Sequence, residues 1–153
     1  YVIDTSNLST AKLKGELRRL FAKSGSSQGR MDVRVSSFGF KYGIPMEADL
    51  VFDVRFLPNP YYVAELRPMN GLDAPVRDYV FQSPVTDEFL SRLGDFVGWL
   101  LPRYEEEGKT ALLVTVGCTG GHHRSVAVAH ALADLVRRAG FPVSESHRDL
   151  GRN

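Results

Sequence analysis

Apolar residues recur at helical spacing in three stretches of the chain. The first stretch follows Ser9 or Thr10, either of which can cap a helix, and the second follows Thr86, the expected cap of the next helix. The third stretch is expected to end at Gly140. Apolar residues three or four positions apart share one helix face, so each helix should bury one side against a core. The expected buried faces are Leu13, Leu17, Leu20 and Phe21; Phe89, Leu93, Phe96, Val97, Leu100 and Leu101; and Val128, Leu132, Leu135 and Val136.

Four shorter apolar runs have the length and composition of β-strands. The first run begins with the alternating residues Val33 and Val35 and ends in Phe38–Gly43. The other three are Leu50–Phe56, Ala111–Val116 and Val143–His147. The segment Tyr61–Arg77 is rich in Pro, Asn, Gly and Asp and is expected to be an irregular, functional loop. Strands separated by helices predict a single α/β domain in which helices cover a parallel or mixed sheet.

Ligands of such sheets bind beyond the carboxyl ends of the strands. This rule brings together three loops, Phe38–Gly43, Leu57–Asp73 and Gly117–Ser125. We therefore expect the functional residues of the domain to lie in these three loops.

The composition limits the class of protein. The chain has 153 residues, 43% of them hydrophobic, which suits one globular domain. No apolar stretch approaches the roughly 18 residues that a membrane span needs, and we expect no membrane partner. The single cysteine excludes an internal disulfide and fits a cytoplasmic setting, and with four histidines it forms no credible structural zinc cluster.

The loop after the third strand has the features of a phosphate-binding loop. Gly120 and Gly121 let the backbone curl around an anion, and the first amides of the following helix have no partner within that helix. Thr119 and Ser125 add hydroxyl donors, and Arg124 adds a planar fork that matches phosphate oxygens. The alternative is an ordinary strand–helix turn in which the glycines only permit the bend.

Cys118 and Arg124 also have the C-x5-R spacing of cysteine-dependent phosphatases. A cysteine at a helix N-terminus beside an arginine is a competent nucleophile. Against catalysis, Gly117 stands where these enzymes usually carry a histidine, and no aspartate lies in an obvious acid loop. The alternative is that Cys118 is a small, buried residue that ends the strand, and we expect no catalysis.

Other polar residues of the three loops are further candidates. One of His122 and His123 is expected to donate to an anion while the other faces solvent, and Lys41 and Tyr42 could reach an anion and a sugar or base. Candidates for ligand or subunit contacts in the second loop are Arg55, Asn59, Arg67 and Asn70. Outside the loops, His130 and Asp134 are expected to form a surface pair, and Trp99 is expected in a core or an interface.

Four long motifs resemble the RapZ family, bacterial RNase adapter proteins that are also described as P-loop nucleotide-binding proteins. The motifs are Ser37–Gly43, Phe52–Pro60, Leu66–Asp73 and Gly117–Ser125, and Val2–Ser6 resembles the junction between the two domains of that family. The resemblance implies that residues 1–8 are the end of a missing N-terminal nucleotide-binding domain or the junction to it. Residues 9–153 would then form a C-terminal ligand-sensing domain. ATP or GTP hydrolysis would then belong to the missing half, because this chain has no G-x-x-x-x-G-K-[ST] sequence. No cofactor is expected in this domain.

The resemblance also implies a ligand, partners and a site. In the enteric branch this domain binds glucosamine-6-phosphate and a small RNA, and the protein is a homo-oligomer. Tyr42 replaces a histidine of that branch, so a nucleotide sugar such as UDP-GlcNAc stays open as the ligand. The tail His147–Asn153 lacks the lysine-rich ending of that branch, so we expect the isolated domain to bind RNA weakly. The expected ligand-binding residues are Lys41, Tyr42, Cys118, Thr119, Gly120, Gly121, His123, Arg124 and Ser125.

Overall fold

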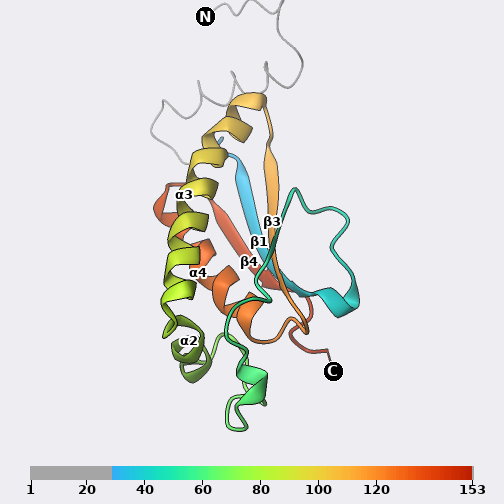
Figure 1. The fold of residues 1–153 in the computed structure, drawn as a ribbon. Coiled ribbons are helices and arrows are strands. Elements are labelled where there is room, and N and C mark those ends of the chain that lie inside the picture. The colour runs from blue at the N-terminus through green and yellow to red at the C-terminus, as the bar shows by residue number, and fades with distance from the viewer. Residues whose placement is uncertain (1–28, 153) are drawn as a thin grey trace, which may run out of the picture.

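Four parallel strands form one sheet in the computed structural model, which describes residues 29–152 (Figure 1). The strands lie in the order β2-β3-β1-β4, and every pairing between neighbours is parallel. Their bounds are Asp32–Gly39 for β1, Leu50–Asp53 for β2, Ala111–Cys118 for β3 and Val143–His147 for β4. The predicted α/β class is therefore confirmed, with a parallel rather than a mixed sheet. The helix predicted after Ser9 or Thr10 lies outside the described residues.

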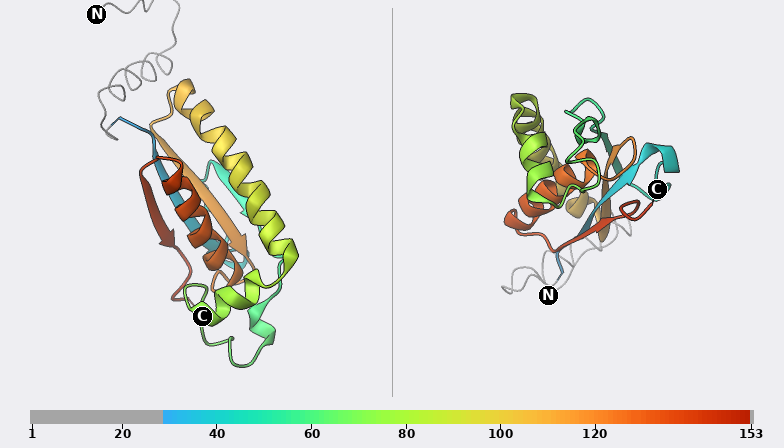
Figure 2. Two further views of the ribbon diagram at one scale, coloured as in Figure 1. Left: turned by 90° about the vertical axis from the view of Figure 1, so that its left-hand side faces the viewer. Right: turned by 90° about the horizontal axis from the view of Figure 1, so that it is seen from below.

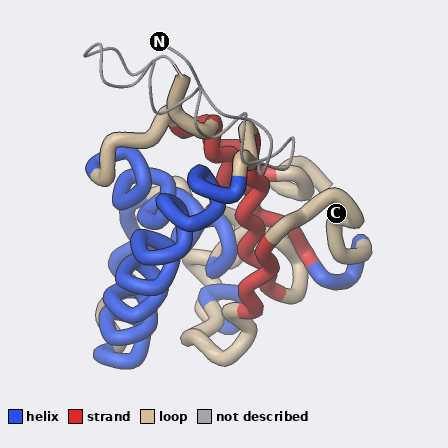
Figure 3. The backbone as a smooth tube through the Cα atoms, turned by 90° about the horizontal axis from the view of Figure 1, so that it is seen from above, coloured by secondary structure: helices blue, strands red, loops and turns tan. Residues whose placement is uncertain are grey.

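Residues 29–152 contain three α-helices, α2 (Ala74–Phe81), α3 (Pro84–Glu107) and α4 (Arg124–Arg138), and α2 packs against the other two. In Figure 2, α3 and α4 lie side by side on one face of the sheet, and Figure 3 shows the same two layers from above. The core lies between the layers, where Val35 of β1 and Val114 of β3 meet buried side chains of the helices such as Leu101 and Leu132. Two short 3-10 helices, η1 (Phe40–Tyr42) and η2 (Pro60–Tyr62), lie in the loops after β1 and β2.

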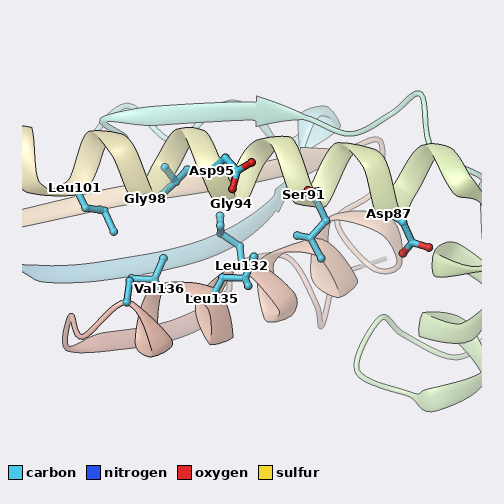
Figure 4. A pocket seen from close by; sticks show the side chains of 12 residues that line it. Asp87, Ser91, Gly94, Asp95, Gly98, Leu101, Leu132, Leu135 and Val136 are labelled. Atoms are coloured by element: carbon cyan, nitrogen blue, oxygen red, sulfur yellow. The ribbon is translucent and has the colours of Figure 1, made fainter.

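The contact between α3 and α4 is close at one point and open beside it. A Cβ added to Gly94 would lie 2.9 Å from Leu135 Cδ1, whereas one added to Gly98 would meet nothing within 4 Å. A groove of about 410 Å³ runs between the two helices, and Figure 4 shows Leu101 of α3 and Val136 of α4 pointing toward one another along it. None of the helices within residues 29–152 is long and apolar enough to cross a membrane.

Several predicted element bounds are wrong. Tyr61–Arg77 is not irregular throughout, because α2 begins at Ala74 after an extended Asp73 and buries Val76 and Val80. Helix α3 begins at Pro84 with Ser83 at the N-cap, so Thr86 is a buried first-turn residue rather than a cap. Strand β2 ends at Asp53, since the chain turns there and the Leu57 amide donates to the Val54 carbonyl (3.1 Å). Strand β3 extends two residues further than predicted, to Cys118.

Two surface predictions also change. His130 does not pair with Asp134, because its Nδ1 lies 2.9 Å from Glu145 Oε2 of β4, while Asp134 pairs with Arg138 of its own helix (2.7 Å). Phe96 was expected on the buried face of α3, but Phe96 and Trp99 are both about half exposed. The predicted apolar face of α3 is thus wider than the face that the core covers.

Candidate functional site

The carboxyl ends of β1 and β3 bring the first and third loops into direct contact. The two strands pair in register up to Gly39 and Cys118, so η1 and the glycine loop start side by side. The Lys41 amide donates to the Thr119 carbonyl (3.2 Å), which fixes one loop against the other. The second loop joins through the Gly71 amide, which donates to the His122 carbonyl (2.8 Å). The three loops predicted to meet therefore do meet.

A pocket of about 540 Å³ opens between these loops. It is lined by Lys41, Asn59, Tyr61, Tyr62, Arg67, Cys118, Thr119, Gly120, His122, His123 and Arg124. Six of the nine expected ligand-binding residues are in this set: Lys41, Cys118, Thr119, Gly120, His123 and Arg124. In the part of the chain that the structure describes, no carboxylate lines the pocket. The pocket is thus cationic.

The two glycines of the loop have different roles. Gly121 has a φ of +79°, and a Cβ there would lie 2.7 Å from the Gly39 amide nitrogen, so both backbone conformation and space require glycine. Gly120 lines the pocket, and a Cβ there would meet nothing within 4 Å. Gly121 therefore allows the loops to pack, whereas Gly120 leaves the backbone accessible from the pocket.

The glycine loop and the first turn of α4 present unpaired amides. Within residues 29–152, the amides from Thr119 to Val126 donate to no backbone carbonyl. The Ala127 amide is the first one of α4 that does, and it donates to the His123 carbonyl (3.0 Å). The aligned peptide dipoles of the 15-residue helix add positive potential at the same place. Together they provide donors and a field suited to an anion.

Arg124 is buried and only 5% exposed. One of its terminal nitrogens donates to the carbonyls of Arg55 (2.6 Å) and Leu57 (3.2 Å), and the other lies 3.4 Å from Thr119 Oγ1. Its Nε is buried with no partner among the described residues. Arg124 thus ties the loop after β2 to helix α4 and still has a donor to satisfy.

Cys118 and Ser125 form the base of the loop. Cys118 Sγ lies 3.1 Å from Ser125 Oγ, and both side chains are buried. Cys118 reaches the pocket wall, but Ser125 does not line the pocket. Within the described residues, the pocket wall contains no carboxylic acid beside the C-x5-R loop.

Both histidines belong to the pocket, contrary to the expectation that one of them faces solvent. His123 is buried, and its Nε2 lies 3.1 Å from the Arg67 carbonyl. His122 Nε2 is buried without a partner in the described part of the chain. Burial lowers the pKa of His122, and the nearby His123 and Lys41 lower it further. A neutral His122 is available to bond a polar ligand atom.

The outer wall of the pocket comes from the second loop. Asn59 Oδ1 accepts the Tyr61 amide (3.1 Å) and so starts η2, and the Arg67 guanidinium lies 4.8 Å from the centre of the Tyr61 ring. Asn59 and Arg67 were among the sequence candidates, whereas Tyr61 and Tyr62 were not. Their only sequence signal is an aromatic pair directly after a proline in a loop.

Several sequence candidates lie outside the pocket wall. The Lys41 ammonium and the Arg152 guanidinium each lie 5.0 Å from the centre of the Tyr42 ring. Arg55 pairs with Asp53 (2.6 Å), and Asn70 Oδ1 accepts the Leu72 amide (2.8 Å) within its own turn. No group of His, Cys, Asp and Glu side chains within residues 29–152 is arranged to hold a metal ion.

Asp149 contacts the end of β1, where the first loop begins, and no sequence pattern indicated this role. It is fully buried, and its Oδ2 accepts the Gly39 amide (2.7 Å) and an Arg148 N–H (2.8 Å). Burial by itself would raise the pKa of Asp149, but the hydrogen bonds from Arg148 and Gly39 and the charge of Arg152 hold it below the ordinary value of 3.8. Asp149 therefore holds the end of β1 where the first loop begins.

We expect Asp149→Asn to destabilise the protein at neutral pH. A carboxylate with a lowered pKa in the folded state contributes stability above its unfolded pKa and loses it as the pH falls through the folded pKa. The difference in unfolding free energy between wild type and Asp149→Asn should thus be full at pH 7 and shrink below about pH 4. Urea unfolding at pH 7, 5 and 3 measures it, with the exposed Asp95→Asn as control. A difference that is constant over this range would contradict the assignment.

Together, these features define an α/β domain with a cationic pocket at the carboxyl edge of a parallel sheet. A family model described as the RapZ C-terminal domain matches residues 31–151, and the chain belongs to this family. This finding confirms the resemblance carried by the four motifs.

Curated relatives with similar sequences have the name nucleotide-binding protein. The chain is 53% identical over 151 residues to such a protein from Caldanaerobacter subterraneus subsp. tengcongensis, covering 99% of this chain and 53% of the relative. It is 51% identical over 152 residues to one from Desulforudis audaxviator, covering 99% of this chain and 51% of that protein. It is 47% identical over 152 residues to one from Clostridium novyi, covering 99% and 52%. The chain spans about half the length of these relatives.

Proposed function

We propose that this domain is a regulatory, metabolite-sensing module that binds an amino-sugar phosphate or a nucleotide sugar in the pocket. The observation that carries this proposal is the pocket wall, where Lys41, Arg67 and Arg124 and two histidines meet with no described carboxylate. The unpaired amides of the glycine loop and of the α4 N-terminus are the expected phosphate donors. Lys41, Tyr42 and the residues Cys118–Gly121 and His123–Ser125 make up the proposed site and its support.

Two ligands fit this chemistry, and they differ in how they would use the pocket. Glucosamine-6-phosphate has one phosphate and one ammonium group. The described pocket wall contains no carboxylate that could pair with the ammonium group. UDP-GlcNAc has two phosphates, a neutral acetamido group and a base that Tyr61 and Tyr62 could stack against. The wall therefore supports the nucleotide sugar at least as well as the sugar phosphate.

Calorimetric titration of the protein with each compound tests the proposal. We expect saturable binding of at least one of glucosamine-6-phosphate and UDP-GlcNAc, and weaker binding of glucosamine, UDP and inorganic phosphate, each of which lacks part of the contact set. Binding should weaken with added salt because charged groups dominate the pocket. If neither compound binds to a protein whose fold is intact by circular dichroism, the proposal is wrong.

The module is proposed to act within a longer, cytoplasmic, homo-oligomeric protein of which this chain is one part. The relatives are named nucleotide-binding proteins and are about twice as long as this chain, so ATP or GTP binding is proposed for the other half. RNA is proposed as a weak, salt-dependent partner of the isolated domain, because acidic residues predominate over residues 47–117. The domain is proposed to need no cofactor and to catalyse no reaction of its own.

A further inference from the structure

The wall of the cationic pocket is unevenly buried. Cys118, His123 and Arg124 are each at most 8% exposed, and we call the glycine loop and the beginning of α4, to which they belong, the pocket floor. Tyr61 and Tyr62 of η2 are 54% and 79% exposed, and we call their side of the wall the pocket mouth. A ligand whose phosphate binds the floor amides therefore has two exposed aromatic rings beside the rest of its structure.

Hydrogen bonds fix the backbone that carries the two rings. Asn59 Oδ1 accepts the Tyr61 amide (3.1 Å), and the Asn59 carbonyl accepts the Tyr62 amide (3.2 Å). Arg67 Nε donates to the Tyr61 carbonyl (2.7 Å), and Pro60 at the start of η2 has a fixed φ. A tyrosine on an ordered backbone loses little entropy when a flat ligand group binds against it. The mouth is thus prepared for such a group.

The two rings differ in how much of their surface is open. Their centres lie 5.9 Å apart and their planes are inclined by 80°, so Tyr61 and Tyr62 meet edge to face. The Arg67 guanidinium lies 4.8 Å from the centre of the Tyr61 ring and so covers one of its faces. Tyr62 is therefore the larger open aromatic surface of the mouth. Stacking on an aromatic side chain suits a nucleobase, because every base has a flat π-face.

We propose that the pocket mouth is a nucleoside subsite, in which Tyr62 stacks with a uracil-type base while the pocket floor binds the diphosphate of the same ligand. This inference rests on the proposed function and narrows it from two ligands to one class, the nucleoside diphosphate sugars. A sugar monophosphate at the floor would leave both rings of the mouth in water.

Charge also favours a diphosphate over an amino-sugar monophosphate. Lys41, Arg67 and Arg124 bring three positive charges to the pocket wall, and its described part has no carboxylate. A diphosphate that is esterified at both ends brings only negative charge to these cations. The ammonium group of glucosamine-6-phosphate would add a positive charge to a wall that has no acid to pair with it. The neutral acetamido group of UDP-GlcNAc avoids this repulsion.

Hydrogen-bond donors at the mouth favour uracil over adenine. Asn59 uses its Oδ1 for the Tyr61 amide, so the side-chain N–H groups of Asn59 remain as donors, and Arg67 adds guanidinium N–H groups. The edge of uracil has two carbonyl acceptors, whereas adenine has an amino donor, and two donors that face each other both stay unsatisfied. We expect UDP-glucose to bind at least about fivefold more tightly than ADP-glucose, which has the same sugar and diphosphate.

Calorimetric titration of the whole chain with UDP-GlcNAc and N-acetylglucosamine-1-phosphate tests the subsite, because the second compound lacks the nucleoside. Tyr62→Ala should weaken UDP-GlcNAc binding at least about fivefold and affect N-acetylglucosamine-1-phosphate much less. Tyr62→Phe keeps the ring and should recover most of the affinity for UDP-GlcNAc. Trp99→Ala, at a 55% exposed aromatic residue outside the pocket wall, is the control and should change neither affinity.

Saturation-transfer NMR reads the contact directly. The H5 and H6 protons of uracil should receive saturation from the wild-type protein and lose most of it with Tyr62→Ala. The subsite is overturned if Tyr62→Ala binds UDP-GlcNAc like wild type, if it weakens both compounds equally, or if UDP-glucose and ADP-glucose bind alike. Binding of glucosamine-6-phosphate without UDP-GlcNAc overturns the subsite but leaves the proposed function standing, whereas binding of neither compound overturns the proposed function itself.

Discussion

Replacing Arg124 by alanine is expected to remove ligand binding and to lower the free energy of unfolding by about 2–4 kcal/mol. The loss of stability follows from burial, because the guanidinium donates to the carbonyls of Arg55 (2.6 Å) and Leu57 (3.2 Å). Without it, two carbonyls lose a charged partner, and each such loss costs about 1–3 kcal/mol. Binding falls for a second reason, since the unpaired Nε and the positive charge beside the glycine loop are both removed.

The comparison with Arg124→Lys separates the two effects. The lysine ammonium group keeps the positive charge but cannot donate to two carbonyls and an anion in one plane as a guanidinium does. We therefore expect Arg124→Lys to bind the ligand at least tenfold more weakly than wild type and to retain part of the unfolding free energy that Arg124→Ala loses. Urea unfolding and calorimetric titration measure the two quantities. Arg138→Ala, at an exposed arginine paired with Asp134, is the control and should change stability by less than about 0.5 kcal/mol. If Arg124→Ala is as stable as Arg138→Ala, the buried hydrogen bonds do not hold the loop.

Gly39→Ala is expected to be a damaging substitution although it adds only one methyl group. The backbone of Gly39 is extended (φ −106°), so alanine is conformationally allowed, and the effect should be purely steric. A Cβ there would lie 2.5 Å from the Gly120 carbonyl carbon and 2.9 Å from the Gly121 nitrogen. These are backbone atoms of the glycine loop and cannot rotate away as a side chain could. Overpacking of this kind costs about 1–3 kcal/mol, and the loop that forms the pocket must shift.

Gly98→Ala provides a matched control on helix α3. A Cβ at Gly98 meets nothing within 4 Å, so this substitution should raise stability by roughly 0.5–1 kcal/mol through helix propensity. We expect Gly39→Ala to lower the unfolding free energy and to weaken ligand binding at least tenfold, whereas Gly98→Ala should bind normally. Normal binding by a stable Gly39→Ala protein would show that the glycine loop tolerates displacement.

The sequence by itself determined the α/β class, the positions of all four described strands and the convergence of three loops. Those features depend on local spacing and on the rule that the carboxyl ends of parallel strands share one edge, so a pattern of residues is enough to indicate them. The four motifs likewise identified the family, and the glycine pair predicted a phosphate-binding loop. Helix α2 was missed because its eight residues include only two buried side chains, Val76 and Val80.

Only the tertiary structure decided what each side chain of the site contacts. Arg124 is buried because the carbonyls of Arg55 and Leu57, nearly 70 residues earlier, fold over it. Asp149 supports Gly39 across a separation of 110 residues, which no local pattern encodes. The apolar excess on α3 shows the same limit, because periodicity gives the apolar width of a helix but not how much of that width its neighbours cover. Contacts between distant segments depend on how the elements pack, and spacing along the chain contains no information about that packing.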